Sequence, residues 1–159
     1  MRVRVIGGGL AGSECSWQLA ERGHQVELVE MRPRRSTEAH KTGNLAELVC
    51  SNSFRADAVH NAVGLLKEEM GLLGSLVIRE GRQARVPAGG AFAVDRERFS
   101  AGMSAAIETH PDITVVREEA TDLELHGADL LVVATGPLTS SPLHQEISSV
   151  LGHESLYFY

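Results

Sequence analysis

The sequence lacks three features that would place it in other classes of protein. No apolar run approaches the roughly 20 residues that a helix needs to cross a bilayer. Residues 1–6 have the pattern of a strand rather than of a basic and apolar signal peptide. The net charge of −6 gives no support for the basic surface that nucleic-acid-binding domains usually carry. We therefore expect no association with a membrane and a cytoplasmic location.

Cysteine and aromatic residues are also scarce. The two cysteines, Cys15 and Cys50, form no C-x-x-C pair and cannot hold a metal by themselves, so we expect no metal site and a reducing compartment. Aromatic residues make up only 4% of the chain, against 16 glycines and 43% hydrophobic residues. In a chain of 159 residues this composition is typical of one α/β domain with glycine turns.

The order of elements over residues 1–30 predicts a dinucleotide-binding site. A short apolar strand at residues 2–6 leads into Gly7-Gly8-Gly9-Leu10-Ala11-Gly12, which fits the G-x-G-x-x-G pattern. A helix should follow to residue 22, and a second strand at residues 25–30 ends on Glu30. Strand, glycine turn, helix, strand and acid is the order that such a site requires.

Each glycine of the pattern has a steric reason. Gly7 allows the tight exit from the strand, Gly9 lets a diphosphate approach the backbone, and Gly12 lets the helix lie near the strand. The unpaired N–H groups at the start of the helix, together with its dipole, favour phosphates. Glu30 can accept hydrogen bonds from ribose hydroxyls and would repel a 2′-phosphate, which favours FAD or NAD over NADP.

A second strand end points to the same ligand. We expect residues 128–134 to form a buried parallel strand that ends at Thr135 and Gly136. In a doubly wound sheet the ligand lies at the carboxyl ends of the strands, so this small turn can approach a second part of the same cofactor. The alternative is that Gly136 is an ordinary glycine at the end of a strand, with no role in binding. The two glycine sites together favour FAD and predict a Rossmann-like, doubly wound α/β domain of the glutathione-reductase type.

The middle of the chain predicts two helices and a hairpin. Residues 62–73 have the spacing of an amphipathic helix. The residues at spacings of three and four along it are Leu65, Leu66, Glu69, Met70 and Leu73. Asp95 should cap a second helix over residues 96–109, with Phe99, Met103 and Ile107 on its buried side. Residues 85–94 read as two short strands about a turn at residues 87–90.

The rest of the chain is expected to be extended or looped. Residues 113–118 and 120–125 suggest a hairpin or a bent strand. The apolar run at residues 156–159 suggests a strand, and its position at the end of the sequence suggests a chain cut within a domain.

Several residues allow two interpretations from sequence alone. One interpretation of the three neighbouring arginines is a solvated basic turn. The other is that one guanidinium contacts the adenosine end of a nucleotide. The three are Arg32, Arg34 and Arg35. His40 is either a solvated loop residue or lies within reach of the cofactor. Residues 89–90 either pass close to the flavin or only make a hairpin turn. Cys50 is either a buried small hydrophobe or a reactive thiol beside a polar run that could stabilise a thiolate.

Several blocks of this sequence resemble the folate- and FAD-dependent tRNA (uracil-5-)-methyltransferases, the TrmFO family. The blocks are Gly7 to Glu14, Trp17 to Gly23, Glu30 to Pro33, Ala46 to Ser53, Asn61 to Met70, Val86 to Gly90, Ala93 to Arg96 and Ala134 to Thr139. The resemblance runs from end to end, and the Glu-Leu-Val-Cys-Ser-Asn-Ser block is not a general Rossmann feature. The family is similar in fold to the flavoprotein GidA/MnmG. Cys15 departs from it, since the family often has alanine there, and is expected to be buried filler.

The resemblance implies an activity and a set of site residues. It implies transfer of a one-carbon group from 5,10-methylenetetrahydrofolate to C5 of the T-loop uridine of tRNA, with FAD as cofactor and NAD(P)H as reductant. Cys50 would be the catalytic cysteine near the isoalloxazine. The expected cofactor-binding residues are Gly7, Gly8, Gly9, Leu10, Ala11, Gly12, Glu30, Met31, Thr135 and Gly136.

The resemblance also implies that more of the protein lies elsewhere. Residues 1–159 would be the amino-terminal part of the FAD-binding domain. The tRNA-facing insertion, a second cysteine that attacks the uridine and the end of the FAD domain would lie beyond residue 159. The alternatives are another FAD-dependent oxidoreductase or GidA-like tRNA-modifying flavoprotein, and a non-catalytic nucleotide-binding fragment.

Overall fold

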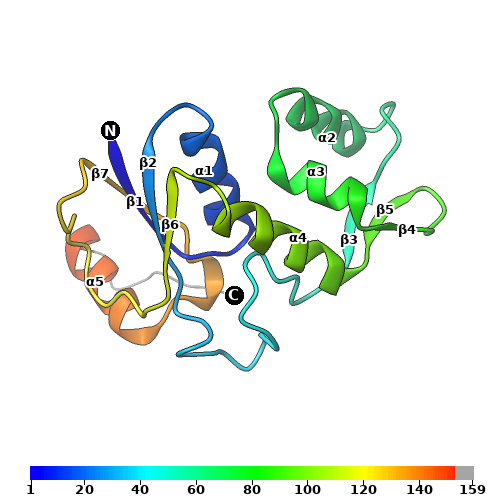
Figure 1. Cartoon of the computed structure of the whole chain (residues 1–159). Coiled ribbons are helices and arrows are strands. Elements are labelled where there is room, and N and C mark those ends of the chain that lie inside the picture. The colour runs from blue at the N-terminus through cyan, green and yellow to red at the C-terminus, as the bar shows by residue number, and fades with distance from the viewer. Residues whose placement is uncertain (153–159) are drawn as a thin grey trace.

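The larger of two sheets is parallel and carries the amino-terminal glycine turn at one end. In this computed structural model, which describes residues 1–152, the sheet has the strand order β6-β2-β1-β7 (Figure 1). Its strands are β1 (Arg2–Ile6), β2 (Gln25–Val29), β6 (Ile113–Val116) and β7 (Leu130–Val133). Val5 pairs with Leu28 on one side and with Val132 on the other. The expected strand at residues 156–159 lies outside the described residues.

A smaller antiparallel sheet forms a second lobe. It has the order β3-β5-β4, and two helices pack with it at the right of Figure 1. The elements of this lobe are β3 (Ser53–Ala56), α2 (Ala62–Leu72), α3 (Leu76–Gln83), β4 (Arg85–Val86) and β5 (Ala91–Val94). The predicted hairpin over residues 85–94 is therefore confirmed.

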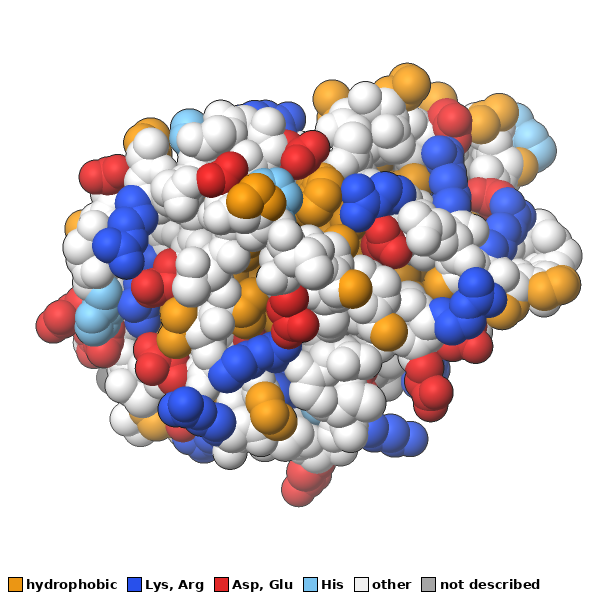
Figure 2. All heavy atoms as spheres, viewed as in Figure 1, with side chains coloured by type: hydrophobic (Ala, Val, Ile, Leu, Met, Phe, Trp, Pro, Cys, Tyr) orange, Lys and Arg blue, Asp and Glu red, His pale blue; other side chains and the backbone are white. Residues whose placement is uncertain are grey.

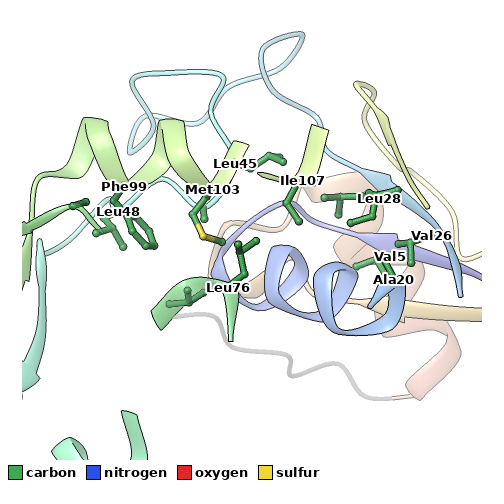
Figure 3. Packing of buried hydrophobic residues seen from close by; sticks show 14 of the residues in the cluster. Val5, Ala20, Val26, Leu28, Leu45, Leu48, Leu76, Phe99, Met103 and Ile107 are labelled. Carbon is green, nitrogen blue, oxygen red and sulfur yellow. The ribbon is translucent and has the colours of Figure 1, made fainter. Parts of the chain in front are cut away.

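Helix α4 joins the two lobes. It runs over Arg96–Glu108, and the side chain of Asp95 accepts a hydrogen bond from the Arg98 N–H, as the sequence predicts. Phe99, Met103 and Ile107 are fully buried along one side of this helix. Figure 3 shows them in one continuous core that also contains residues of the parallel sheet and of α3.

Three further helices complete the described fold. Helix α1 (Leu10–Ala20) follows the glycine turn, η1 (Gly136–Leu138) is a short 3-10 helix, and α5 (Ser141–Leu151) follows it. Among residues 1–152, no helix has the length and apolar content needed to cross a bilayer. Positive and negative side chains are interspersed on the face shown in Figure 2.

Helix α2 forms over Ala62–Leu72, close to the predicted range, but its leucines do not face the core. Leu65, Leu66 and Leu73 are 47%, 54% and 69% exposed, and hydrophobic side chains project at the upper right of Figure 2, over α2. The helix instead buries Gly64 and Lys67. Gly64 packs against the carbonyl of residue 58 so closely that a Cβ there would lie 2.0 Å from its oxygen, and Lys67 donates to two carbonyl oxygens.

Two other predictions are wrong, and one helix was not predicted. Residues 120–125 form no strand, because β6 pairs with β2 in parallel and not with a following hairpin partner. Strand β7 lies at the sheet edge, where Leu130 and Val133 are exposed rather than buried. Helix α3 was not predicted from the sequence, although Ser75 caps it by accepting from the Ile78 N–H.

Candidate functional site

A cavity of about 280 Å³ opens where β1, β2 and β7 end. The start of α1, the loop between β2 and β3, residues 118–120 and the segment from residue 134 into α5 also line it. Eight of the ten predicted cofactor residues line it: Gly7, Gly9, Leu10, Ala11, Glu30, Met31, Thr135 and Gly136. The other two, Gly8 and Gly12, are buried. The structure thus brings together residues that are more than 120 positions apart in the chain.

The glycine turn is shaped by close backbone approaches. A Cβ on Gly12 would lie 1.8 Å from the carbonyl oxygen of Gly7, so only glycine lets α1 start this near to the strand. Gly7 has a φ of +104°, which other residues rarely adopt. A Cβ on Gly9, by contrast, would meet no described atom within 4 Å. The Gly9 position therefore leaves room for a ligand.

The start of α1 presents backbone donors to this open space. Gly9 is the N-cap residue, and no side chain in the described chain caps the helix there. The first intrahelical hydrogen bond runs from the Ser13 N–H to the Gly9 carbonyl at 3.0 Å. Leu10 and Ala11, whose N–H groups precede this bond in the helix, line the cavity. Such a helix start favours an anion.

The end of β7 lies directly against this turn. A Cβ on Gly7 would be 2.8 Å from the Cα of Thr135. The Thr135 hydroxyl is 2.6 Å from that of Thr139, which donates to the Gly136 carbonyl at 2.7 Å. Gly136 has a φ of +62° and faces open space. The two glycine signals of the sequence therefore meet at one cavity.

Glu30 is almost fully buried at the cavity wall, at 5% exposure. Its carboxylate accepts hydrogen bonds from the Gly8 N–H at 2.8 Å, from the Arg32 N–H at 2.9 Å and from Arg32 Nε at 2.8 Å. Burial alone would raise the pKa of Glu30, but the hydrogen bonds and charge of Arg32, with the Gly8 N–H, outweigh it and hold the pKa below its usual value.

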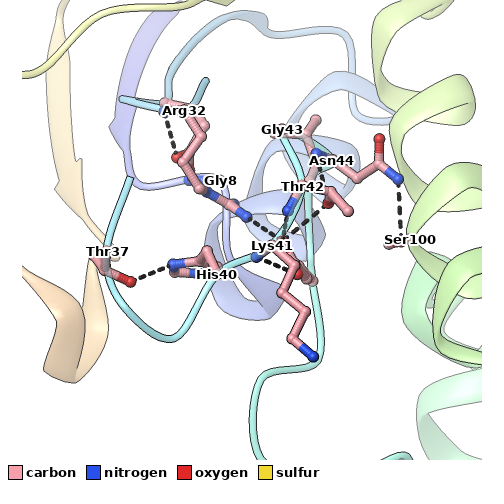
Figure 4. A network of polar contacts seen from close by, with 12 residues as sticks. Gly8, Arg32, Thr37, His40, Lys41, Thr42, Gly43, Asn44 and Ser100 are labelled. Carbon is pink, nitrogen blue, oxygen red and sulfur yellow. Dashed lines mark hydrogen bonds and ion pairs between the residues drawn. The ribbon is translucent and has the colours of Figure 1, made fainter. Parts of the chain in front are cut away.

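Arg32 is only 1% exposed, so the interpretation of a solvated basic turn is wrong for this residue. Its guanidinium lies between Glu30 and Glu47, with Nη1 at 3.2 Å from Glu47 Oε2. Figure 4 shows the surrounding polar network. Arg34 is exposed, and Arg35 pairs with Glu119 at the surface. The three neighbouring arginines thus have three different environments.

His40 lines the cavity, which favours the second of its two interpretations. Its Nδ1 lies 2.8 Å from the Thr37 hydroxyl (Figure 4). Burial and the charge of Arg32 lower the pKa of His40, although Glu47 and Glu30 act in the opposite direction.

Glu47 is a wall residue that the sequence analysis missed. It lies in a mostly apolar segment, and an acid among apolar residues is the one signal that could have identified it. Residues 89–90, by contrast, do not line the cavity, and Gly89 has a φ of +58° in the turn between β4 and β5.

Cys50 is exposed and lies outside the cavity wall, whereas its neighbour Val49 lines the cavity. Arg96 Nη2 donates to the Cys50 carbonyl at 3.2 Å, and Asn52 Nδ2 donates to the Val94 carbonyl at 3.0 Å. Cys50 is therefore not a buried small hydrophobe. Cys15 packs partly buried against the core, and burial raises the pKa of its thiol. Residues 1–152 contain no group of side chains that could hold a metal ion.

Comparisons of the sequence extend this picture. Residues 2–155 match the family described as "Glucose inhibited division protein A". The chain is 58% identical over 157 residues to a protein of Symbiobacterium thermophilum, covering 99% of this chain and 35% of that protein. It is 55% identical over 158 residues to a protein of Aquifex aeolicus, with the same coverages. Both are named "Methylenetetrahydrofolate--tRNA-(uracil-5-)-methyltransferase TrmFO". The chain thus spans about a third of the length of these curated relatives.

Solved structures share the fold. The match to GidA from Aquifex aeolicus has a TM-score of 0.66 at 18% identity, over 86% of this chain and 25% of that one. The match to glycine oxidase from Geobacillus kaustophilus has a TM-score of 0.57 at 14% identity, over 92% and 58%. These likenesses confirm the predicted α/β fold with a parallel sheet.

Proposed function

Because this chain belongs to the family described as glucose inhibited division protein A, we propose that it is the FAD-binding part of a folate-dependent tRNA (uracil-5-)-methyltransferase. The observation that supports this most directly is the meeting of two glycine-bearing strand ends and an uncapped helix start at one cavity. Residues 1–159 are the amino-terminal part of the FAD domain in this proposal. The tRNA-facing part belongs to the share of the relatives that this chain does not cover.

The residues of the cavity suit a dinucleotide. The N–H groups of Leu10 and Ala11 would orient the diphosphate, and Gly9 would admit it to the backbone. Glu30 would accept a hydrogen bond from a ribose hydroxyl, while Thr135 and Gly136 would enclose the other side. Gly7 and Met31 also line the cavity, whereas Gly8 and Gly12, the other two residues expected to bind the cofactor, are buried and would shape the turn. The volume of about 280 Å³ is at the lower end for small-molecule sites, as expected if the longer protein completes the site.

The proposed reaction assigns separate tasks to cofactor and protein. Bound FAD would supply the reducing equivalents that turn the folate-derived one-carbon unit into a methyl group, with NAD(P)H as reductant and 5,10-methylenetetrahydrofolate as donor. The chain's own residues bind and orient the cofactor. tRNA is the acceptor, and a cytoplasmic location is part of the proposal because tRNA is modified there.

Cys50 is the proposed catalytic residue. A thiolate is the reactive form of cysteine, and a reactive thiol must be accessible. Cys50 is exposed, and it directly follows a cavity-lining residue, so we place its thiol beside the cofactor in the complete protein. The hydrogen bonds from Arg96 and Asn52 tie the segment to β5 and α4.

Two measurements on the complete protein test the proposal. Purified protein should carry flavin absorbance, and labelled methylenetetrahydrofolate should transfer its carbon to a tRNA transcript. Flavin without transfer would favour another FAD-dependent oxidoreductase or a GidA-like tRNA-modifying flavoprotein. Absence of flavin, with no uptake of added FAD, would leave only the non-catalytic nucleotide-binding fragment.

A further inference from the structure

We propose that Arg32 is the positioning residue that orients Glu30 toward the ribose, and that Glu47 holds Arg32 in place. The inference rests on the proposed binding of FAD, and it names the groups that recognise the sugar. It applies to any adenosine nucleotide with a diphosphate and free ribose hydroxyls. Neither Arg32 nor Glu47 needs to touch the nucleotide for this role.

The hydrogen bonds of Glu30 leave one acceptor position open. Each carboxylate oxygen can accept about two hydrogen bonds. Oε1 receives both the N–H and the Nε–H of Arg32, so it is saturated. Oε2 receives only the Gly8 N–H. One position on Oε2 therefore remains for a donor in the cavity, and a ribose hydroxyl is such a donor.

Arg32 is held from its far side by Glu47. Besides Arg32 Nη1, this carboxylate accepts the N–H of Lys41 at 2.9 Å, the N–H of Thr42 at 3.1 Å and the Thr42 hydroxyl at 2.9 Å. Figure 4 shows how these contacts gather the loop around the guanidinium. With Glu30 on one side and Glu47 on the other, the guanidinium has little freedom to rotate.

The residues just before Glu47 are also hydrogen-bonded to the glycine turn. The Ala46 N–H donates to the Gly8 carbonyl at 2.8 Å, and the Gly8 N–H donates to Glu30. The preceding residue, Leu45, donates its N–H to the Ser104 hydroxyl of α4 at 2.8 Å. Glu30, the glycine turn and the loop at residues 41–47 therefore form one connected unit. Its hydrogen bonds fix the site before a nucleotide enters.

The charges of the unit favour a hydroxyl rather than a phosphate. Two carboxylates share one guanidinium, and the pKa of Glu47, like that of Glu30, lies below its usual value. For Glu47, burial would raise the pKa, but donors from Lys41 and Thr42 and the charge of Arg32 outweigh it. The unit thus carries a net charge of about −1. Arg32 is only 1% exposed, and its Nε and Nη1 are already engaged by Glu30 and Glu47.

The experiment compares nucleotides that differ by one hydroxyl. The complete protein, stripped of flavin, is titrated by calorimetry with ADP, 2′-deoxy-ADP and 3′-deoxy-ADP. A hydrogen bond to a charged group contributes about 1.5–3 kcal/mol, so wild-type protein should prefer ADP over at least one deoxy analogue by about 10- to 150-fold. In Arg32→Gln this preference should fall below about threefold. Arg34→Gln, in the same loop but exposed, is the matched control and should keep it.

A purely structural role for Arg32 predicts another result. Arg32→Gln would then weaken ADP and both deoxy analogues by the same factor, and an unchanged preference would overturn the proposal. Glu47→Gln keeps Arg32 but removes the carboxylate that holds its Nη1, so it should also reduce the preference for ADP over the deoxy analogues. This variant tests the proposal if Arg32→Gln does not fold. Wild-type protein that binds ADP without any preference would overturn this inference alone. Wild-type protein that binds neither ADP nor FAD would refute the proposed function as well.

Discussion

Gly9 and Gly12, both in the glycine turn at residues 7–12, should respond to alanine in opposite ways. At Gly9 the backbone has a φ of −73°, which alanine adopts, and a new Cβ would meet no described atom within 4 Å. Replacing a helix N-cap glycine by alanine costs up to about 1 kcal/mol. The melting temperature of the flavin-free protein should therefore fall by only about 2–4 °C.

Cofactor binding by Gly9→Ala should fall much further than stability. The new methyl group would occupy the space in which we place the diphosphate, and it would push the phosphates away from the N–H groups of Leu10 and Ala11. Each hydrogen bond to a charged group contributes about 1.5–3 kcal/mol. Loss of two of them amounts to at least about 3 kcal/mol, or a more than 100-fold weaker affinity for FAD.

Gly12→Ala is the matched comparison. Its Cβ would lie 1.8 Å from the Gly7 carbonyl oxygen, a backbone atom that cannot rotate away. Overpacking typically costs about 1–3 kcal/mol, and this clash between fixed backbone segments should cost at least that much. Thermal unfolding and flavin fluorescence titration of both variants measure the two effects. Wild-type FAD affinity in Gly9→Ala would refute the placement of the diphosphate.

Three further predictions concern the thiol, the acid and the core. Cys50→Ala in the complete protein should retain FAD but lose most methyl transfer to tRNA, whereas Cys15→Ala should keep both. Normal turnover by Cys50→Ala would contradict a catalytic role for the Cys50 thiol. Because the folded-state pKa of Glu30 is lowered, its stabilisation is present above its unfolded pKa of about 4.3 and is lost as the pH falls through the folded value. Unfolding by urea should therefore show stability declining below about pH 4.5, with a shallower decline in Glu30→Gln, and parallel curves would contradict the assignment. Met103→Ala should destabilise the protein by about 2–5 kcal/mol because the side chain is fully buried. Leu72→Ala, at a position that is 85% exposed, should change the free energy of unfolding by less than about 0.5 kcal/mol. Similar losses in both variants would contradict the packing of the core.

The parts of the fold that the sequence predicts are those with local signals. The strand, glycine turn and helix at residues 2–20 follow from short-range chemistry, since Gly12 is required wherever a helix starts this close to a strand. Helix α4 is equally local, because Asp95 caps it and its apolar residues recur at a helical spacing. The meeting of the β1 and β7 ends was predicted from the general topology of parallel sheets.

The parts that were missed depend on distant partners. Arg32 lies among arginines beside Pro33, in a segment that reads as solvated, and only its contacts with Glu30 and Glu47 explain its burial. In α2 the leucine spacing indicates an apolar face but not which face is covered. Close packing at Gly64 and the carbonyl contacts of Lys67 decide the orientation, and neither is visible in a hydrophobic pattern.

The central claim is that the glycine turn binds the diphosphate of FAD, and a comparison of two flavins tests it most directly. The complete protein, stripped of its flavin, is titrated with FAD and with FMN, which lacks the second phosphate and the adenosine. We predict tight binding of FAD and at least 100-fold weaker binding of FMN, because FMN cannot fill the space beside Gly9 and Glu30. Equal affinities for the two flavins would contradict the claim.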